Sequence, residues 1–251
     1  MNEQRSKADI PNAGNLDPAV YPAIPFDDAD WAWFKQRAAV FGVDEADSHR
    51  PVIERLYGHL CGVNAWFNLT RITAPREYLK LHLLDSLSLW PDSRCQSLVD
   101  GVPCVDLGAG GGYPGLPLAL WKPQVPWTLV DSRRRKVDFL AAAGSLVGPN
   151  VTAKHFRGRE VGSAAPELFQ QCQLVVSRAA GAVDKLLPEI VDMLAPKGQI
   201  VIYKGPNYSQ EEHDRAADIA PKIGLRFVTV SAIQLEDDDP ERLFVVFERT
   251  R

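Results

Sequence analysis

Apolar residues follow two different rhythms along the chain, and the change comes near residue 100. Before it, the stretches 27–43, 50–67 and 75–90 carry apolar side chains at near-helical spacing, and each opens near a proline. Acidic residues also occupy the first turn of the first stretch. We therefore predict three helices within residues 26–95.

After residue 100, short apolar runs alternate with amphipathic stretches of helix length, which predicts βαβ units and a parallel sheet. The last two runs are joined only by "SAIQLEDDDPER", whose Asp239-Pro240 pair is a turn signal, so we expect an antiparallel hairpin at the sheet edge. The acidic run Glu236–Asp239 is expected to be a solvated turn. The predicted strands are 103–107, 127–130, 151–156, 174–177, 199–203, 225–230 and 243–248.

Three segments follow from these patterns. Residues 96–251 are predicted to form an α/β domain with a doubly wound, mostly parallel sheet, and residues 26–95 a helical cap on it. Residues 1–25 are rich in Pro, Asn and Ala with little periodicity, so we expect a flexible leader outside the core. The composition, with 45% hydrophobic and 24% charged residues, is that of an ordinary globular protein.

Membrane, disulfide and metal classes find no support in the sequence. No stretch approaches the roughly 18 apolar residues of a membrane span, and the start of the chain lacks an apolar signal segment, so we expect a cytoplasmic protein without a membrane partner. Cys61, Cys95, Cys104 and Cys172 form no C-x-x-C pair, and the five histidines form no ligand-spaced cluster. We therefore expect neither disulfides nor a metal site.

The formal net charge of −4 gives no global attraction to nucleic acid, so any RNA contact must be local. One local candidate is the basic run Arg133–Lys136 at the start of a predicted helix, where like charges oppose the helix dipole. The run fits either an anion partner or a solvated face.

The richest segment is "VDLGAGGGYPGLPLAL", residues 105–120, between a short apolar run and a longer one. Its glycines, which include Gly108, Gly110 and Gly112, follow a predicted parallel strand. A ligand at the carboxyl end of such a strand meets backbone, and glycine permits both a tight turn and a close approach. The loop is predicted to cradle a nucleotide.

Two kinds of nucleotide fit the glycine spacing. Residues 110–115 satisfy G-x-G-x-x-G, the fingerprint of NAD(P)-dependent oxidoreductases. Against a dinucleotide, Asp106 would bring a negative charge toward a pyrophosphate, and Pro114 lacks a backbone N–H where phosphate needs donors. An acid before the glycines suits a cationic or zwitterionic ligand instead.

The pattern D-x-G-x-G-x-G resembles the first motif of Rossmann-like class I S-adenosylmethionine-dependent methyltransferases, and Asp131, at the end of the second predicted strand, matches their ribose-binding acid. With "NAWFNLTRI", "HLLDSLSL", "VSRA" at 176–179 and "YKG" at 203–205, the chain resembles over roughly residues 50–250 the bacterial ribosomal RNA small subunit methyltransferase G family, also called glucose-inhibited division protein B. That family methylates N7 of a guanine in 16S rRNA, giving 7-methylguanosine.

The resemblance implies S-adenosylmethionine as cofactor and a set of contacts to it. The expected cofactor-binding residues are Asp106, Gly108, Gly110, Gly112, Tyr113, Asp131, Gly158, Arg159 and Arg178. The expected partner is 16S rRNA or the 30S ribosomal particle, with Lys204, Arg133 and Arg134 as candidate RNA contacts and the chain as a monomer. Val63 and Leu81 depart from the family pattern, the second where a basic residue is common, a role that Lys80 could fill.

In the helical cap, the resemblance places Asn64, Asn68, His82, Asp85 and Ser86 near the cofactor and the target base. N7 of guanine has an available lone pair and loses no proton, so methyl transfer needs no general base. We therefore assign His82 a positioning role with Asp85, and expect catalysis from the alignment of the reacting atoms by Arg178, Asn68 and His82.

Other side chains are open to two interpretations. Asn68 and Tyr113 could hold an extruded base, whereas Phe67 is expected to pack in the core. A non-catalytic RNA-binding or protein-binding module with a vestigial cofactor pocket is a further alternative.

Overall fold

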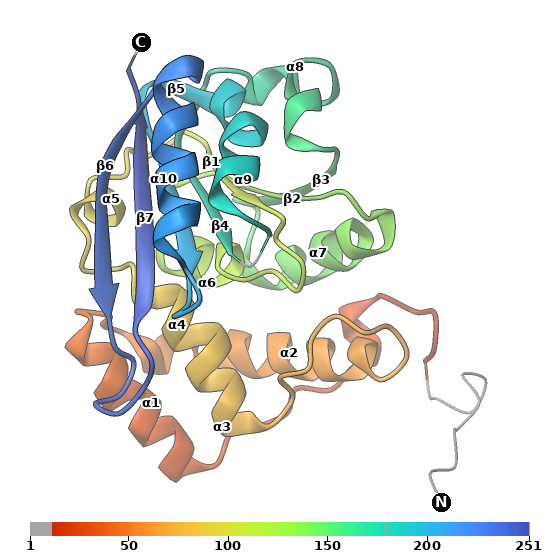
Figure 1. The fold of residues 1–251 in the computed structure, drawn as a ribbon. Helices are drawn as coiled ribbons and strands as arrows, with labels where there is room; N and C mark the ends of the chain where they lie inside the picture. Colours follow the sequence, from red (N-terminus) through yellow and green to blue (C-terminus); the bar gives the residue numbers. More distant parts are fainter. Residues whose placement is uncertain (1–11, 179, 251) are drawn as a thin grey trace, which may run out of the picture.

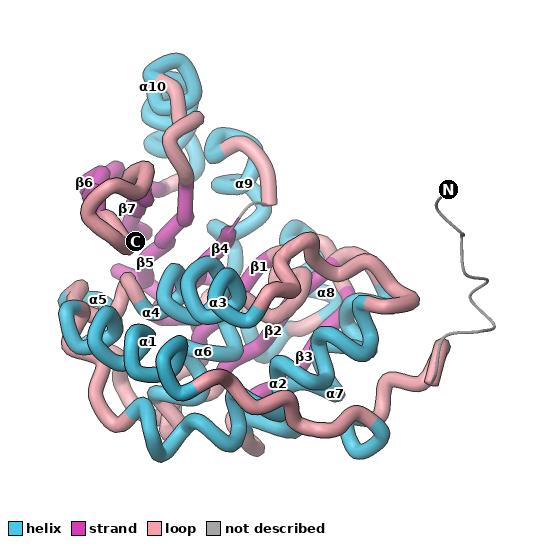
Figure 2. Tube along the Cα trace, turned by 90° about the horizontal axis from the view of Figure 1, so that it is seen from below, coloured by secondary structure: helices cyan, strands magenta, loops and turns pink. Residues whose placement is uncertain are grey.

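A seven-stranded sheet with helices on both faces forms the centre of the computed structural model, which describes residues 12–178 and 180–250 (Figures 1 and 2). The strand order is β3-β2-β1-β4-β5-β7-β6. Strands β1 to β5 run parallel, and β7 runs antiparallel to both β5 and β6. The strands are β1 Cys104–Leu107, β2 Trp127–Asp131, β3 Val151–His155, β4 Cys172–Arg178, β5 Leu194–Lys204, β6 Leu225–Ile233 and β7 Arg242–Arg249. The predicted doubly wound sheet and its edge hairpin are confirmed.

Helices α9 and α10 cover one face of the sheet and α6 and α7 the other (Figure 2). None of the described helices is both long and apolar enough to span a membrane. The helices are α1 Asp28–Val40, α2 Ala46–Asn64, α3 Pro75–Tyr78, α4 Asp85–Leu87, α5 Ser93–Gln96, α6 Gly115–Trp121, α7 Arg134–Val147, α8 Val161–Ala164, α9 Val183–Ile190 and α10 Gln210–Ile219. Short 3-10 turns are η2 Pro18–Val20, η4 Gly158–Glu160, η5 Pro166–Leu168, η6 Val191–Met193 and η7 Ala220–Ile223.

The three predicted cap helices are present and lie below the sheet in Figure 1. The first is α1, the second α2, and the third is a continuous run of α3, the π-helical turn η3 Leu79–Leu84 and α4. Asp27 caps the N-terminus of helix α1, because its side chain accepts a hydrogen bond from the Ala29 N–H. The cap thus brings η3 to the carboxyl ends of the parallel strands.

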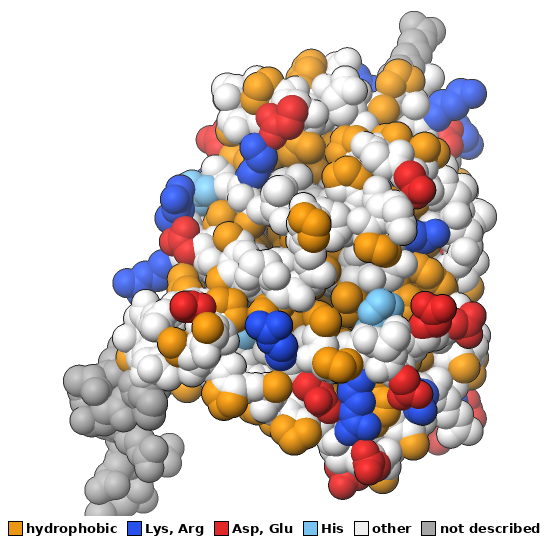
Figure 3. All heavy atoms as spheres, turned by 180° about the vertical axis from the view of Figure 1, so that it is seen from behind, with side chains coloured by type: hydrophobic (Ala, Val, Ile, Leu, Met, Phe, Trp, Pro, Cys, Tyr) orange, Lys and Arg blue, Asp and Glu red, His pale blue; other side chains and the backbone are white. Residues whose placement is uncertain are grey.

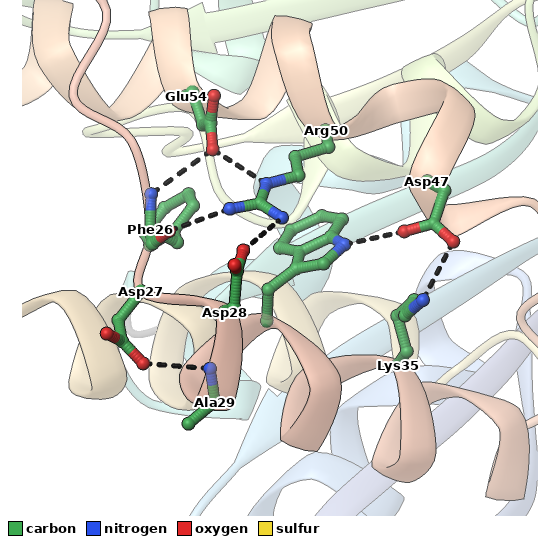
Figure 4. Close-up of polar contacts among 9 residues, drawn as sticks. Phe26, Asp27, Asp28, Ala29, Lys35, Asp47, Arg50 and Glu54 are labelled. Atoms are coloured by element: carbon green, nitrogen blue, oxygen red, sulfur yellow. Dashed lines mark hydrogen bonds and ion pairs between the residues drawn. The ribbon is translucent and has the colours of Figure 1, made fainter.

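Arg50 of α2 ties the start of α1 to the second helix (Figure 4). Its Nη2 donates to the Phe26 carbonyl oxygen at 2.7 Å, Nη1 pairs with Asp28 at 3.1 Å, and Nε donates to Glu54 at 2.8 Å. Asp47 of α2 accepts a hydrogen bond from the indole N–H of Trp31 at 2.8 Å. The contacts to Phe26, Asp28 and Trp31 join side chains of α2 to the segment around α1, whereas the Arg50–Glu54 pair lies within α2.

Part of the segment predicted as a leader packs into the core. Tyr21 is 8% exposed, and its hydroxyl oxygen accepts from the Trp66 indole N–H at 3.1 Å. The close approach depends on glycine, since a Cβ at Gly62 would lie 2.0 Å from the Tyr21 ring. The expectation that residues 1–25 lie outside the core is therefore wrong at Tyr21, while residues 1–11 lie outside the described residues, as does Ala179 of the "VSRA" motif. A single buried ring held by long-range contacts leaves no periodic signal.

The acidic run between β6 and β7 docks on the cap, so its assignment as a solvated turn is only partly right. Glu236 accepts from the Trp33 indole N–H at 3.0 Å and pairs with Lys80. Asp239 pairs with the same Lys80 at 2.7 Å, whereas Asp237 is exposed. The Lys80 charge is thus held by two carboxylates of the hairpin.

Candidate functional site

The glycine loop leaves β1 with three glycines in the left-handed region, Gly108 at φ 77°, Gly110 at 58° and Gly112 at 96°. A Cβ at Gly112 would lie 2.2 Å from Leu116, and one at Gly108 would lie 2.7 Å from Cβ of Ala180. A Cβ at Gly110 would meet only Lys136 Nζ, at 3.7 Å, and the Gly108 carbonyl oxygen, at 3.8 Å. A Cβ at Gly110 would therefore make only ordinary van der Waals contacts, whereas Gly112 is needed for packing within the protein.

Asp131 closes the loop at the end of β2. Its Oδ2 accepts from the Gly110 N–H at 3.2 Å and its Oδ1 from the Arg133 N–H at 2.9 Å. The carboxylate lines a cavity of about 340 Å³ together with Gly108 and Gly158. The structure thus brings together four of the predicted cofactor residues, Gly108, Gly110, Asp131 and Gly158, around one end of the loop.

The Asp106 side chain is buried beneath the glycine loop, whereas the sequence predicts a direct contact of this residue with the cofactor. The residue is 0% exposed, and its Oδ2 accepts from the Gly115 N–H at 2.7 Å. Burial raises the pKa of this carboxyl to about 7, although the Gly115 hydrogen bond lowers it. Asp106 therefore supports the turn into α6. The sequence could place an acid before the glycines but not the side of the loop on which it would lie.

A second cavity, of about 180 Å³, lies at the other end of the loop. Gly108 lines both cavities. Lys136 and Arg178 bring two positive charges to the second one, and Lys136 lies 3.9 Å from Asp131. In the sequence Lys136 was identified only as part of a basic run, although its position in the first turn of the helix after Asp131 could have indicated this place. The residues that line this second cavity are Leu69, Thr70, His82, Gly108, Ala109, Gly110, Gly111, Tyr113, Lys136 and Arg178.

His82 is 6% exposed and stacks on Tyr113, with ring centroids 4.3 Å apart. Its Nδ1 lies 3.1 Å from Arg178 Nη2, and its Nε2 lies 3.1 Å from Thr70 Oγ1. A guanidinium only donates, so Nδ1 accepts and Nε2 carries the proton that is donated to Thr70. Burial, with the Arg178 charge, lowers the pKa of His82 to about 3. The imidazole is neutral at physiological pH.

Arg178 ends β4 and contacts three groups of the cap. Its Nη1 donates to the Leu81 carbonyl oxygen at 2.8 Å and to Asp85 Oδ2 at 2.6 Å, and its Nη2 faces His82. The other oxygen of Asp85 forms an ion pair with Arg242 Nε at 3.0 Å. Asp85 therefore links two arginines from distant strands. The positioning role of His82 and Asp85 stays a prediction, and Arg242 was not identified from the sequence because it belongs to no motif.

A third and larger cavity, of about 460 Å³, lies on the other side of Arg178 and His82. It is bounded by η3, the ends of β4 and β5, the segment after β5 and the start of β7. Its lining residues are Ile72, Leu81, His82, Asp85, Arg178, Tyr203, Lys204, Gly205, Asn207, Tyr208 and Arg242.

Several predicted site residues lie away from these cavities. The Arg159 side chain is 66% exposed and its Nε pairs with Glu189 at 2.6 Å, and Asn68 is exposed at the surface. Asn64 Oδ1 accepts from the Leu69 and Thr70 N–H groups, which shapes the turn after α2. Ser86 is fully buried and donates to the His82 carbonyl oxygen.

Phe67 is half-buried and packs against the core as expected. Within residues 12–178 and 180–250, no group of three or more His, Cys, Asp or Glu side chains could hold a metal.

The candidate RNA residues differ in their surroundings. Arg133 and Arg134 are exposed at the start of α7, and Arg134 pairs with Asp138 at 3.1 Å. Lys204 lines the third cavity and pairs with Glu212 at 2.8 Å.

On the back face of the molecule, cationic and acidic side chains are intermixed (Figure 3). Positive charge on that face is thus local, as the net charge predicts.

The glycine cradle fits an adenosyl group with an attached amino acid. The carboxylate of Asp131 in one cavity suits the hydroxyls of a ribose. The cations Lys136 and Arg178 in the other cavity suit the carboxylate of the amino acid, and the backbone of Gly110 lies between them.

Comparison with known proteins agrees with this arrangement. The family described as "rRNA small subunit methyltransferase G" matches residues 50–235. Proteins named ribosomal RNA small subunit methyltransferase G are similar to the chain: that of Myxococcus xanthus is 35% identical over 83% of the chain and 92% of its own length, and that of Sorangium cellulosum 34% identical over 71% and 73%.

A solved structure of a mutant 16S rRNA (adenine(1408)-N(1))-methyltransferase from Catenulisporales acidiphilia has a similar fold. Its TM-score is 0.50 at 13% identity, over 63% of this chain and 89% of that chain. At this identity the similarity shows the fold alone.

Proposed function

The chain belongs to the rRNA small subunit methyltransferase G family, and from that premise we propose that it transfers a methyl group from S-adenosylmethionine to N7 of a guanine in 16S rRNA. The observation that carries the proposal is the glycine loop at the end of β1, whose Gly110 N–H donates to Asp131 at the end of β2. The product is 7-methylguanosine in the RNA.

The residues that would hold the methyl donor lie on both sides of the glycine loop. Asp131 accepts hydrogen bonds from ribose hydroxyls, with Gly158 bordering the same cavity. Lys136 and Arg178 attract the carboxylate of the amino-acid part. Gly108 and Gly110 keep the space between these groups free of side chains.

S-adenosylmethionine, when bound, supplies an electrophilic methyl group on a sulfonium sulfur. The chain's own residues need only orient the acceptor, because guanine N7 offers a lone pair and no proton leaves. Neutral His82 and the Asp85 carboxylate hold Arg178 from two directions, at 3.1 Å and 2.6 Å. The three side chains lie at the boundary between the glycine loop and the cavity of about 460 Å³.

The finer assignments belong to the same proposal. We infer that the substrate is 16S rRNA or the 30S particle, that the protein acts as a monomer without a metal in the cytoplasm, and that residues 26–95 act as a cap on a catalytic domain of residues 96–251. Arg133, Arg134 and Lys204 are assigned to RNA contact. The exposure of the two arginines supports their part of this assignment.

Calorimetry with S-adenosylhomocysteine and NADH tests the proposal against a dinucleotide-binding oxidoreductase. We expect binding of the thioether and none of NADH, and the reverse result would overturn the methyltransferase assignment. Transfer of label from S-adenosylmethionine to 30S particles then separates an enzyme from a binding module. A protein that binds the thioether but incorporates no methyl group would be such a module.

A further inference from the structure

The cavity of about 460 Å³ beside Arg178 shares a wall with the glycine loop. Arg178 and His82 line both this cavity and the 180 Å³ cavity at the loop. A methyl acceptor must reach the donor from a neighbouring space, and this volume lies within the range of about 300–1,000 Å³ typical of small-molecule sites. The cavity is therefore placed and sized for one nucleotide.

The lining of this cavity is cationic although the whole chain is acidic. Arg178, Lys204 and Arg242 line it with one carboxylate, Asp85, which pairs with both arginines. Lys204 pairs with Glu212, which does not line the cavity. Arg242 pairs with Asp85 through Nε, and no hydrogen bond among the described residues involves its two Nη groups. A guanidinium whose Nη groups donate no hydrogen bond within the protein suits a phosphate, which it can bind by two parallel hydrogen bonds.

Tyr208 supplies an aromatic ring to the same cavity. Its hydroxyl lies 3.1 Å from His213 Nδ1, and Lys204 Nζ lies 5.8 Å from the ring centroid. The hydrogen bond to α10 limits the orientations of the ring, which favours stacking against a flat partner. Enzymes that act on a base in RNA hold it on aromatic side chains once it is out of its stack.

From this placement we propose that the cavity is the acceptor-nucleotide pocket, in which the target guanine stacks on Tyr208 and an adjacent phosphate pairs with Arg242. The proposal rests on the function proposed above. It assigns specificity for the nucleotide to two residues outside the family motifs, Tyr208 after β5 and Arg242 at the start of β7.

Single-turnover methylation of 30S particles from a strain lacking this protein, at particle concentrations below saturation, tests the role of Tyr208. Tyr208→Ala should lower the rate constant about 5- to 150-fold, the range for loss of one base–aromatic stack. Tyr208→Phe keeps the ring and loses only the bond to His213, so it should stay within about threefold of wild type. S-adenosylhomocysteine affinity should be unchanged in both variants, which also confirms folding.

Arg242 is tested by the salt dependence of binding to the same particles. Arg242→Ala should lower the slope of log affinity against log salt by about 0.7 to 0.9, as expected for one lost phosphate contact. Arg226→Ala is the matched control, since Arg226 lies on the neighbouring strand β6 and pairs with Glu248 at 2.7 Å. That control should leave the slope unchanged.

The outcomes separate the pocket from the function on which it depends. A wild-type protein that methylates the particles while Tyr208→Ala reacts at the wild-type rate, or Arg242→Ala keeps the wild-type slope, overturns the pocket and leaves the function standing. Weaker binding of S-adenosylhomocysteine to Tyr208→Ala, with unchanged affinity for the particles, assigns the cavity to the donor and also overturns it. A wild-type protein that binds S-adenosylhomocysteine but methylates no particle overturns both proposals.

Discussion

Arg178 Nη2 lies 3.1 Å from Nδ1 of His82, and this contact fixes the state of the histidine. Because the guanidinium can only donate, Nδ1 must be unprotonated, and the remaining proton on Nε2 is donated to Thr70. A protonated imidazole would direct an N–H toward a cation in a buried place. These contacts favour a role for His82 in orienting Arg178 over a role in proton transfer, which the pH dependence of methylation tests.

Methylation should have no pH step from His82. The pKa of this histidine, lowered to about 3 by burial and by Arg178, keeps it neutral around physiological pH. His82→Asn, which retains a hydrogen-bonding side chain, should keep substantial single-turnover activity. The measurement is the rate on 30S particles against pH for both proteins, with RNA binding determined separately. A sigmoidal step near the reference pKa of about 6.5 in wild type, lost in the variant with more than about a thousandfold of rate, would make His82 a general base.

The same histidine should make folding sensitive to acid. Its pKa is about 3 in the folded protein and about 6.5 when unfolded, so between these values the unfolded chain binds the extra proton. Stability should fall as pH drops through this window, by up to about 1.4 kcal/mol per pH unit from His82. Urea unfolding at about pH 7 and about pH 5 should show a smaller loss for His82→Asn than for wild type. Equal losses in the two proteins would mean that His82 titrates normally in the folded state.

Asp131 and Asp106 should differ sharply in their effect on cofactor binding. Asp131→Ala removes the acceptor at the 340 Å³ cavity and should weaken S-adenosylhomocysteine binding by about 1–3 kcal/mol. Asp106→Asn acts on a carboxyl with no exposed surface, and its amide oxygen can still accept from the Gly115 N–H. Its affinity should stay within about threefold of wild type. Calorimetry decides, and an affinity of Asp131→Ala within about twofold of wild type would remove that residue from the site.

Alanine substitutions at two glycines of the loop should impair the protein in different ways, one in folding and the other in cofactor binding. Gly112→Ala places a Cβ 2.2 Å from Leu116, so it should lower the free energy of unfolding more than Gly110→Ala, whose Cβ meets nothing closer than 3.7 Å. Both substitutions share the strain of a positive φ, about 1–2 kcal/mol. Gly110→Ala should be the variant that stays folded and loses S-adenosylhomocysteine binding. Urea unfolding and calorimetry on the pair check this, and normal affinity in Gly110→Ala would contradict the cradle.

The sheet and the loop could be predicted because both are encoded locally. The alternating apolar runs predict seven strands in the order of β1 to β7 along the chain, and the glycine spacing predicts the turn after β1. The positioning role predicted for His82 rests on the chemistry of guanine N7 and stays a prediction. Each of these inferences used residues close in sequence or a property of the substrate.

Contacts between distant segments could not be predicted. Arg242 reaches Asp85 only because β7 inserts antiparallel beside β5, and nothing near Arg242 in the sequence indicates that neighbour. The docking of Glu236 on Lys80 and the burial of Tyr21 depend in the same way on the path of the chain. Asp106 shows a related limit, because a period-2 strand pattern does not say which face of β1 carries the ligand.

The position of the methyl group in the RNA decides whether this protein methylates N7 of a guanine in 16S rRNA. The protein is incubated with labelled S-adenosylmethionine and with 30S particles from a strain that lacks it, and the RNA is digested and analysed by mass spectrometry and site mapping. We expect label in 16S rRNA as 7-methylguanosine at one position, and about 5- to 150-fold less label at low cofactor concentration when Asp131→Ala replaces wild type. Label on another base or another atom, or no label while S-adenosylhomocysteine still binds, would contradict it.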